Sequence, residues 1–585
     1  MKLKSFSLKL RLRLKKLIID LKKTHLKDLR NTLFANVKKV PDIVHLKNIV
    51  LFSSVLSIVI ISMFVNRFNI LNSFFITEIP VVGGVYSHGV IGTIESINPL
   101  FAQGDAEEAA VSLIYSGLTR TVSGKQIPDL AETWTVSSDG LTYDFLLRHD
   151  ISWHDGSVFT ADDVVYTIQL IQNPDTRTSL YDVWNGVTVE KVGDYEVKFT
   201  LPNPYPKFLE VANQGILPVH LLKGIDAKNI KVAEFNMAPI GTGPYSFIRF
   251  DQAGTQTEVV FEANDSFAIG KPYISQINLV LYDSEDSLYE GLARRQISGT
   301  SEISINNLDS VKDLANLEIN ETYFPQYEVL CLNYNNTILA NKDIRKALAA
   351  AVNRSEIISK VFNDEAMAVS AVLLPGLSGY DSSVSGIAYD VNAANTALDT
   401  AGWTRGENGV RQKEGVSLSF NFVYVDNSEN NEVATILKEQ LAAVGVELKL
   451  IAADESLISP NYIRPRNYDM ILIGQNVGFD EDLYSFWHSS QKTNTGLNLS
   501  SFASDEVDNL LEQVRKSNDE NYRSVRYREV QNVINEETPA IFLYSPLNFS
   551  AISRDVHVIE QTALSEASDV LNNIYVWYIE TEKTR

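Results

Sequence analysis

The part of this chain that decides its fold is residues 127–168, which read IPDLAETWTVSSDGLTYDFLLRHDISWHDGSVFTADDVVYTI. Residues 141–147 alternate between the two faces of an extended chain closely enough to predict a half-buried strand. Asp-Gly pairs at 139–140 and 155–156 supply turn chemistry, because glycine accepts the positive φ that such turns require. The order predicted is therefore strand, turn, strand, turn and then a helix.

Thr160 and Asp163 are predicted to cap the N-terminus of that helix. A threonine followed three residues later by a carboxylate forms a capping box, here in a short-armed form. Every residue of the segment has a structural role of this kind. The segment therefore indicates a fold and does not identify what the protein binds.

The charge of the chain reverses sign along its length. Residues 1–47 carry 14 Lys and Arg against three Asp and Glu, a net charge of +11, and the remainder carries 37 basic and 70 acidic residues, a net of −33. The acidic part argues against binding to nucleic acid, whose phosphates it would repel. The basic arm is expected to be an amphipathic helix on the anionic inner leaflet or a disordered tail.

Between these two parts lies an uncharged segment, residues 49–65. At about 1.5 Å per residue it is roughly 26 Å long as a helix, enough for a short membrane span with polar flanks. The positive-inside rule places the arm in the cytoplasm and the rest outside. No small-residue cleavage site follows, and the only cysteine is Cys331, so an uncleaved signal anchor over 48–66 is favoured over a cleaved leader or a lipoprotein. A buried core helix is the alternative to a membrane span.

The exported part is too long for a single core and suits two lobes or more. Cys331 sits in an apolar run and is expected to be a buried small hydrophobe. Helices and strands alternate without internal repeats, which predicts a mixed α/β architecture. The clearest helices are expected at 105–118, 341–352, 392–401 and 432–444, and the clearest further strands at 195–201, 245–250 and 446–451.

Several short motifs recur in a fixed order along residues 82–585. They are Ser-Ile-Asn-Pro-Leu at 96–100, Ile-Tyr-Ser-Gly-Leu at 114–118, the segment 127–168, Gly-Thr-Gly-Pro-Tyr at 241–245, Ile-Arg-Lys-Ala-Leu at 344–348, Ala-Val-Asn-Arg at 351–354, Ala-Gly-Trp at 401–403 and Asn-Ile-Tyr-Val at 573–576. In this order the chain resembles the family 5 extracellular solute-binding proteins, the peptide- and nickel-binding components of ABC importers.

The resemblance implies a two-lobed α/β fold of the periplasmic-binding-protein type (type II, cluster C-like) behind one N-terminal transmembrane helix. The domains expected from it are a basic cytoplasmic arm (1–47), a signal anchor (48–66), a linker (67–81), lobe I (82–280, completed by 546–585) and lobe II (281–545). The two crossings are expected near 279–282 and near 544–546. Two adjacent crossings make a hinge, because few residues need to change φ and ψ.

Enzymatic chemistry has no support in the sequence. It contains no Gly-x-Ser-x-Gly, His-Glu-x-x-His, Walker or Cys-x-x-Cys motif. His154 and Asp155 suggest a metal pair, but no further ligand stands at a suitable spacing, and a turn residue is the simpler reading. No enzyme activity, cofactor or metal is therefore expected.

The ligand-binding residues expected in lobe I come from loops that face the cleft in the resembling family. Tyr181 and Trp184 offer flat apolar contact with a polar tip. The remaining lobe I candidates carry groups able to hydrogen-bond a peptide: Gln103, Glu107, Asn213 and Gln214. Ordinary loop surface or lobe packing is the alternative for each.

The expected binding loop of lobe II, residues 474–487, departs from the family. Peptide binders tend to carry a Trp there and, three residues on, an Asp that takes the peptide amino group, followed by an acidic-Pro pair. Aligning Asp482 with the acidic member puts Asn476 at the Trp position and Phe479 at the Asp position, with Asp480 one residue away. These four are the lobe II candidates. Nickel is less expected than a peptide because these loops hold no histidine before His488.

The function predicted is a membrane-anchored extracytoplasmic receptor, expected to be a monomer, that binds peptides or similar small solutes between two closing lobes and delivers them to the permease subunits of an ABC importer. One alternative is a surface receptor or sensor that keeps the fold without transport, because a tethered N-terminus could signal inward. The other is a non-peptide ligand such as a metal chelate or a sugar.

Overall fold

The computed structural model describes residues 77–253, 256–478, 482–493, 496–517, 519–559, 561 and 564–584. The predicted arm, anchor and most of the linker lie outside these residues, as do Phe479 and Asp480. Among the helices of the described part, none is long and apolar enough to cross a membrane.

The chain divides into two compact units, one of residues Met1–Ile79 with Glu582–Arg585 and one of residues Pro80–Thr581. A two-stranded sheet joins β1 (Thr77–Pro80) to β23 (Thr581–Thr584). The larger unit holds two lobes that share strand β22 (Ala540–Ser553) of one 12-stranded sheet.

The lobe I part of the large sheet has strands in the order β22-β12-β2-β11-β10-β9, with β13 on the other side of β22. Strand β2 lies between two parallel neighbours, β11 and β12, and the other pairs are antiparallel. The bounds are β2 (Val85–Ile91), β9 (Tyr245–Ala253), β10 (Gln256–Ala263), β11 (Gln276–Tyr282), β12 (Gly299–Ile303) and β13 (Leu317–Tyr323).

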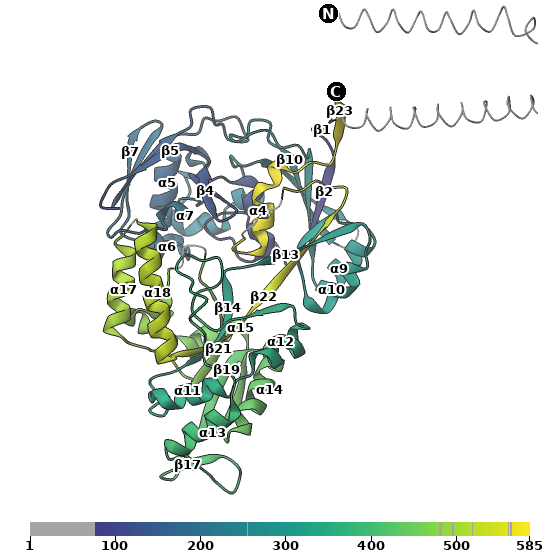
Figure 1. The fold of residues 1–585 in the computed structure, drawn as a ribbon. Helices are drawn as coiled ribbons and strands as arrows, with labels where there is room; N and C mark the ends of the chain where they lie inside the picture. The colour runs from purple at the N-terminus through teal and green to yellow at the C-terminus, as the bar shows by residue number, and fades with distance from the viewer. Residues whose placement is uncertain are drawn as a thin grey trace, which may run out of the picture. The chain divides into compact units, whose positions relative to one another are not determined.

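The two crossings between the lobes lie at the end of β13 and inside β22 (Figure 1). Strand β22 pairs with β14 as far as Tyr544 and with β13 from Leu547 onward, which confirms the crossing expected near 544–546. The other expected crossing, at 279–282, is wrong. Those residues end β11, which pairs with β2 over its whole length, so lobe I continues through β13 to Tyr323.

The reason is the parallel β-α-β connection, whose helix returns the chain to the same sheet. Helix α9 (Glu285–Ala293) carries the chain from β11 to β12, and both strands flank β2. A local pattern of strand and helix does not show whether the chain returns to the same sheet or leaves lobe I. We therefore use lobe I for residues 80–323 with 547–581, and lobe II for residues 326–545.

Residues 127–168 supply two strands, β5 and β6, of a small second sheet of lobe I, whose order is β5-β6-β8-β7. Helix α5 (Ala161–Ile171) follows it and begins with the predicted capping box: the backbone N–H of Thr160 donates to Asp163 Oδ2 at 2.9 Å. The strands are β5 (Ala131–Val136), β6 (Thr142–Leu147), β7 (Thr188–Gly193) and β8 (Glu196–Thr200).

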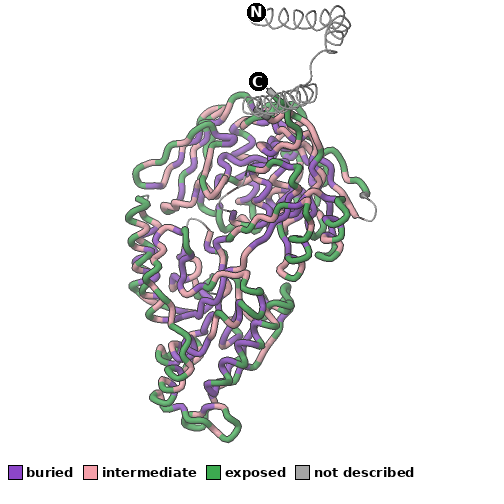
Figure 2. Tube along the Cα trace, turned by 45° about the vertical axis from the view of Figure 1, so that its right-hand side comes forward, coloured by how far each residue is buried: buried purple, intermediate pink, exposed green. Residues whose placement is uncertain are grey.

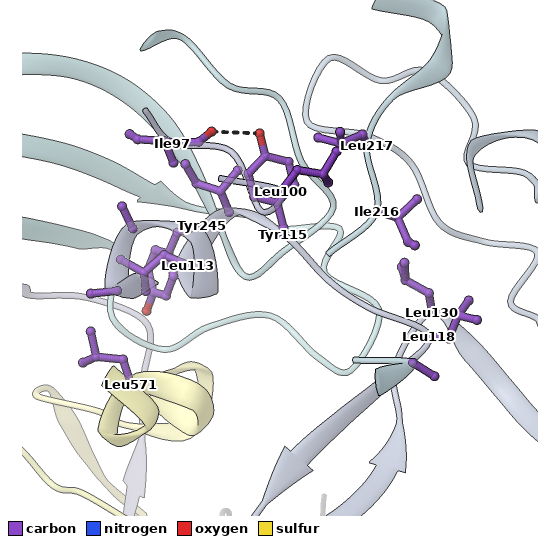
Figure 3. Packing of buried hydrophobic residues seen from close by; sticks show 14 of the residues in the cluster. Ile97, Leu100, Leu113, Tyr115, Leu118, Leu130, Ile216, Leu217, Tyr245 and Leu571 are labelled. Carbon is purple, nitrogen blue, oxygen red and sulfur yellow. Dashed lines mark hydrogen bonds between the residues drawn. The ribbon is translucent and has the colours of Figure 1, made fainter. Parts of the chain in front are cut away.

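The core of lobe I contains buried side chains from both sheets and from the helices around them, and Figure 3 shows part of it. Leu113 of α4 and Tyr245 of β9 are both fully buried there, and the hydroxyl of Tyr115 donates to the carbonyl oxygen of Ile97 at 3.2 Å. The other elements of lobe I are β3 (Thr119–Val122), β4 (Lys125–Pro128), α4 (Asp105–Ile114), α6 (Tyr181–Trp184), α7 (Phe208–Val211), α8 (Val219–Leu222), α10 (Ile305–Lys312), η2 (Pro174–Thr176), η3 (Ala227–Val232), η4 (Glu234–Met237) and η7 (Ala567–Val576).

Lobe II is built on the strands β20-β19-β21-β14-β22 with a hydrophobic cluster on each face. The buried trace runs along the central strands, and the outer helices are largely exposed (Figure 2). Cys331 of β14 is 1% exposed, as expected. The strands are β14 (Gln326–Leu332), β15 (Ala366–Ala368), β16 (Thr404–Arg405), β17 (Arg411–Lys413), β18 (Val416–Ser417), β19 (Ser419–Val425), β20 (Glu447–Ala453) and β21 (Met470–Asn476).

The helices of lobe II include three of the four predicted from the sequence. The predicted helix 432–444 is longer than expected, because it begins after the cap residue Asn427, whose side chain accepts from the N–H of Asn430. The helices are α11 (Lys342–Ala350), α12 (Arg354–Phe362), α13 (Val391–Thr400), α14 (Ser428–Ala443), α15 (Glu455–Ile458), α16 (Tyr484–Trp487), α17 (Asp505–Arg515), α18 (Glu520–Glu537), η5 (Ser459–Ile463) and η6 (Ser489–Lys492).

Candidate functional site

A cavity of about 710 Å³ lies between the two lobes. Its lobe I wall comes from α6, α7 and the loop that follows β8, and its lobe II wall comes from α16 and α17. A cavity of this size, lined by two bodies that share a hinge, is the usual form of a small-molecule site.

The lobe I wall of this cavity is largely apolar. It includes Val183, Leu201, Pro204, Tyr205 and Phe208. The prolines around Tyr205 end the strand β8 and turn the chain toward lobe II, because proline lacks the N–H needed to continue a strand. This wall can therefore accept apolar groups of a ligand.

The lobe II wall is organised by one ion pair. Arg515 of α17 donates from Nε to Asp482 Oδ1 at 3.1 Å and from Nη2 to Asp482 Oδ2, so the contact is bidentate. The guanidinium carbon lies 3.7 Å from the ring centroid of Tyr484 and 5.9 Å from that of Tyr205 in lobe I. Arg515 thus stacks between aromatic rings of both lobes while its charge is balanced by Asp482.

Among the predicted lobe I residues, Gln103 and Glu107 lie at the start of α4. The side chain of Gln103 is exposed. Glu107 is 7% exposed, and its carboxylate accepts 2.9 Å hydrogen bonds from the backbone N–H groups of Glu95, Ser96 and Gln103. Glu107 therefore shapes the loop before α4, and its role as a ligand contact stays a prediction.

The predicted residues Asn213 and Gln214 lie beside that loop. Asn213 is exposed, whereas Gln214 donates from Nε2 to the carbonyl oxygen of Pro99 at 3.1 Å. A Cβ on Gly215 would lie 2.9 Å from Cβ of Pro99, so only glycine permits this close approach. Asn213 is thus available to a ligand, and Gln214 joins the two loops.

Tyr181 and Trp184 differ in their surroundings. Tyr181 is half-buried, but Trp184 is 1% exposed and packs on Phe199 and Phe208 at ring distances of 5.9 and 5.7 Å. The residues of α6 and its cap that line the cavity are Asp182, Val183 and Asn185. Residues of the predicted segment therefore line the cavity, but the side chain of Trp184 packs into the core of lobe I.

In lobe II, Asn476 at the end of β21 reaches the other lobe. Its Nδ2 donates to the carbonyl oxygen of Ser565 at 3.1 Å, and its Oδ1 accepts from the N–H of Gly478 at 2.9 Å. Phe479 and Asp480 follow directly and lie outside the described residues. Asp482 is in the cavity wall but is engaged by Arg515.

A second feature is a set of five acidic side chains whose pKa is raised, which we call the interlobe carboxylates: Asp105, Glu302 and Glu566 of lobe I and Glu328 and Glu429 of lobe II. Burial by the surrounding protein, reinforced by neighbouring carboxylates, raises the pKa of Glu302, Glu328 and Glu566 to about 7. The charge of Glu429 contributes to the raised pKa of both Glu302 and Glu328, so the group spans the two lobes.

Sequence reasoning missed Tyr205, Arg515 and the interlobe carboxylates. Tyr205 stood in a Pro-rich stretch that reads as a strand terminator, and Arg515 ends an ordinary amphipathic helix. The interlobe carboxylates come from five distant parts of the chain. No local pattern marks any of them.

His154 forms part of a turn. Its Nδ1 accepts from the N–H of Gly241 and its Nε2 donates to the carbonyl oxygen of Gly243, both at 3.2 Å. Burial lowers the pKa of His154 to about 4, so the ring is neutral. Among the side chains that the structure describes, no group of three His, Cys, Asp or Glu is arranged to hold a metal ion.

Known proteins resemble this chain in both sequence and structure. A family model described as bacterial extracellular solute-binding proteins, family 5 middle, matches residues 125–496. The oligopeptide-binding protein AppA of Bacillus subtilis is 29% identical over 490 residues, which cover 82% of this chain and 89% of AppA. The structure of AppA in complex with a nonapeptide has a TM-score of 0.71 at 26% identity and covers 86% of this chain and 100% of that one.

A second solved structure has the same TM-score as that of AppA. NikZ from Campylobacter jejuni in complex with Ni(L-His) has a TM-score of 0.71 at 28% identity, covering 84% of this chain and 99% of that chain. This chain therefore shares its two-lobed architecture with AppA and NikZ along nearly the whole length of those two proteins.

Proposed function

The chain belongs to the family 5 bacterial extracellular solute-binding proteins, and from that premise we propose that it binds a peptide or a similar small solute between its lobes and delivers it to an ABC permease. The observation that carries the proposal is the cavity of about 710 Å³ with one wall from each lobe. The similarity to AppA, whose structure holds a nonapeptide, supports a peptide as the solute.

The mechanism follows from the hinge. Closure brings the apolar lobe I wall and the lobe II wall onto the ligand, and only a ligand that contacts both lobes stabilises the closed form over the open one. A decisive shift of this equilibrium needs several kcal/mol of differential binding. The permease would then engage the closed form.

The ligand contacts proposed first are the predicted side chains that are exposed: Gln103 and Asn213 of lobe I and Asn476 of lobe II, none of which lines the cavity of about 710 Å³. Tyr181, Phe479 and Asp480 are proposed with them on the sequence alone. Glu107, Trp184, Gln214 and Asp482 act through the contacts described above, by positioning these loops. We also propose that residues 48–66 anchor a monomeric receptor in the membrane, with residues 1–47 in the cytoplasm.

A metal chelate is the second candidate ligand, because NikZ, crystallised with Ni(L-His), is similar over the whole fold. A thermal-shift screen of the full-length protein against peptide pools, single sugars and Ni(L-His) separates the candidates. The proposal expects stabilisation by peptides. Stabilisation by the chelate or a sugar with no response to any peptide would refute the peptide reading, and native mass spectrometry of the purified protein would identify a retained solute.

A further inference from the structure

The lobe I wall of the cavity of about 710 Å³ keeps apolar surface in contact with water. Val183 of α6 is 49% exposed, and Val211 of α7 and Tyr205 are half-buried, although all three line this space. Phe208, which also lines it, is 1% exposed and fixes the wall to the core of lobe I. Removing apolar surface of this kind from water is favourable, and the group that covers it best is itself apolar.

The charged side chains of the lobe II wall are paired with one another. Arg515 makes the bidentate contact with Asp482, and Lys516 donates from Nζ to Glu512 Oε2 at 3.0 Å. Among the described residues of lobe II that line the cavity, these are the four that carry charge. A charged group of a ligand would therefore leave water without gaining an unpaired partner on this wall.

On the lobe I side, the charged residue that lines the described part of the cavity is Asp182. Its side chain is exposed and therefore hydrated. An ion pair with a hydrated surface carboxylate contributes little. Asp182 thus offers a basic ligand only a small gain, and it repels an acidic one.

Arg515 gives the lobe II wall a flat face that is weakly hydrated. Its guanidinium carbon lies 3.7 Å from the ring centroid of Tyr484, whose ring stacks on that of His488 at 4.0 Å with an angle of 15° between the planes. From lobe I, the ring of Tyr205 approaches the same guanidinium at 5.9 Å. A guanidinium holds water less strongly than an ammonium group and packs on flat apolar groups. Arg515 therefore accepts an apolar neighbour although it carries a charge.

We propose that this cavity is a selectivity pocket for a large apolar side chain of the ligand, which packs on Val183, Tyr205 and Val211 of lobe I and is covered by Arg515 and Tyr484 of lobe II. The inference rests on the proposed function and adds the chemical class of the solute: a peptide with a large apolar residue in preference to one with a polar or charged residue at that position. The exposed contacts proposed above do not line this cavity, so different residues hold the rest of the peptide. Because both lobes contact the selected side chain, it also favours the closed form.

The experiment uses the full-length protein and the pentapeptides Ala-Ala-X-Ala-Ala, in which X is Phe, Leu, Gln, Lys or Glu. Isothermal titration calorimetry is expected to show that the Phe and Leu peptides bind at least about tenfold more tightly than the Gln peptide, which is about 1.4 kcal/mol. The Lys peptide should bind within about threefold of the Gln peptide, and the Glu peptide more weakly than both. The preference for Phe should be the same at low and high salt, because it does not depend on an unpaired charge.

Substitutions in the lobe I wall locate the effect. Val183→Asn and Val211→Asn replace apolar surface of the cavity by amide groups, and the combined variant is expected to bind the Phe and Gln peptides within about threefold of each other. Val183→Asn alone, at the more exposed position, should remove part of the preference. Val192→Asn is the matched control: Val192 of β7 is 53% exposed and does not line the cavity, so the full preference should remain. A melting curve for each variant confirms that it is folded.

Arg515→Met tests the pairing of charges in the lobe II wall. It leaves the carboxylate of Asp482, whose side chain is 15% exposed, without its arginine. The Lys peptide should then gain about fivefold relative to the Gln peptide, or about 1 kcal/mol. Arg515→Met combined with Asp482→Asn removes both charges and should abolish this gain. A Lys peptide that gains nothing from the single change would overturn the placement of the selected side chain beside Arg515.

The outcomes for the peptide series separate the two proposals. Equal binding of the Phe and Gln peptides, or a preference for Phe that survives in the combined valine variant, overturns the apolar pocket and leaves the solute-binding function standing. If no peptide of any composition binds, the proposed peptide-binding function fails and the inference fails with it.

Discussion

Asn476 at the end of β21 donates from Nδ2 to the carbonyl oxygen of Ser565 at 3.1 Å, and this hydrogen bond joins lobe II to lobe I. Ser565 immediately precedes Glu566, one of the interlobe carboxylates. The acidic neighbours of Glu566 (Glu108, Asp569 and Asp105) all belong to lobe I. The hydrogen bond from Asn476 to Ser565 is therefore a direct attractive contact between the lobes.

Asn476→Ala removes the hydrogen bond between the lobes and is expected to favour the open form. A net hydrogen bond contributes about 0.5–1.5 kcal/mol, so the dissociation constant for the ligand should rise by roughly two- to tenfold. Small-angle scattering of the ligand-free protein should show a larger radius of gyration. Asn392→Ala, on the exposed side of α13, is the control and should change neither quantity; an unchanged affinity for Asn476→Ala would show that the contact is not used in closure.

The pair of Arg515 and Asp482 is expected to stabilise the cavity wall of lobe II. A double-mutant cycle with Arg515→Met and Asp482→Asn should give a coupling energy of about 1 kcal/mol in chemical denaturation, because the contact is bidentate and partly shielded from solvent. Arg515→Lys should recover only part of it, since an ammonium group cannot form the fork or stack on Tyr484 in the same way. A coupling energy near zero would contradict the structural role of the pair.

The free energy of unfolding should fall as the pH rises, because Glu328 loses its proton in the folded protein. Burial, followed by the charge of Glu429, raises its pKa from 4.5 to about 7, so the native state holds this proton more tightly than the unfolded chain. The stabilisation is complete below pH 4.5 and is lost as the pH rises toward 7. The titratable groups coupled to it are Glu429 of α14, Tyr544 of β22 and Cys331 of β14.

Glu328→Gln isolates this effect, because the other titrating groups cancel in the comparison with the unmodified protein. The melting temperature of the variant, relative to that of the unmodified protein, is expected to be higher at pH 8 than at pH 5 by about 1 °C or more. A difference that is constant with pH would show that Glu328 titrates as it does in the unfolded chain.

Trp184 is expected to matter for stability more than for ligand contact. Trp184→Ala should lower the free energy of unfolding by about 3–5 kcal/mol, because it leaves a cavity beside Phe199 and Phe208. Asn185→Ala lies next to it in the wall of the large cavity and should alter binding with little effect on stability. The reverse pattern would place the tryptophan in the ligand site.

The local structure of lobe I could be predicted because its signals are local. The capping box of Thr160 and Asp163 is satisfied within one helical turn. The alternation of residues 141–147 likewise corresponds to β6, whose inward side chains include Tyr143 and Phe145. Patterns of this range depend on neighbouring residues and need no knowledge of the rest of the fold.

The lobe boundary expected near 279–282 was wrong because its position depends on long-range pairing of strands. Whether the chain leaves lobe I after β11 depends on β12 and β13 pairing with β2 and β22. The paired residues are up to 253 positions apart in the sequence, as in the pair Gly299 and Ile552. The burial of Trp184 could not be predicted either. The residues around it in the sequence do not show whether its side chain faces a cleft or packs into a core. Only the packing partners distinguish them.

The sequence by itself determined that this chain has the two-lobed α/β fold of its family, because capped helices, Asp-Gly turns and alternating strands follow from short-range backbone and side-chain preferences. Only the tertiary structure decided which predicted side chains are already engaged in other contacts and how Arg515 of lobe II lies against Tyr205 of lobe I. It also decided that the charge of Glu429 raises the pKa of both Glu302 and Glu328. The physical reason is that the charge and shape of a cleft are sums over elements that meet only after folding, whereas a helix cap or a turn is complete within a few residues.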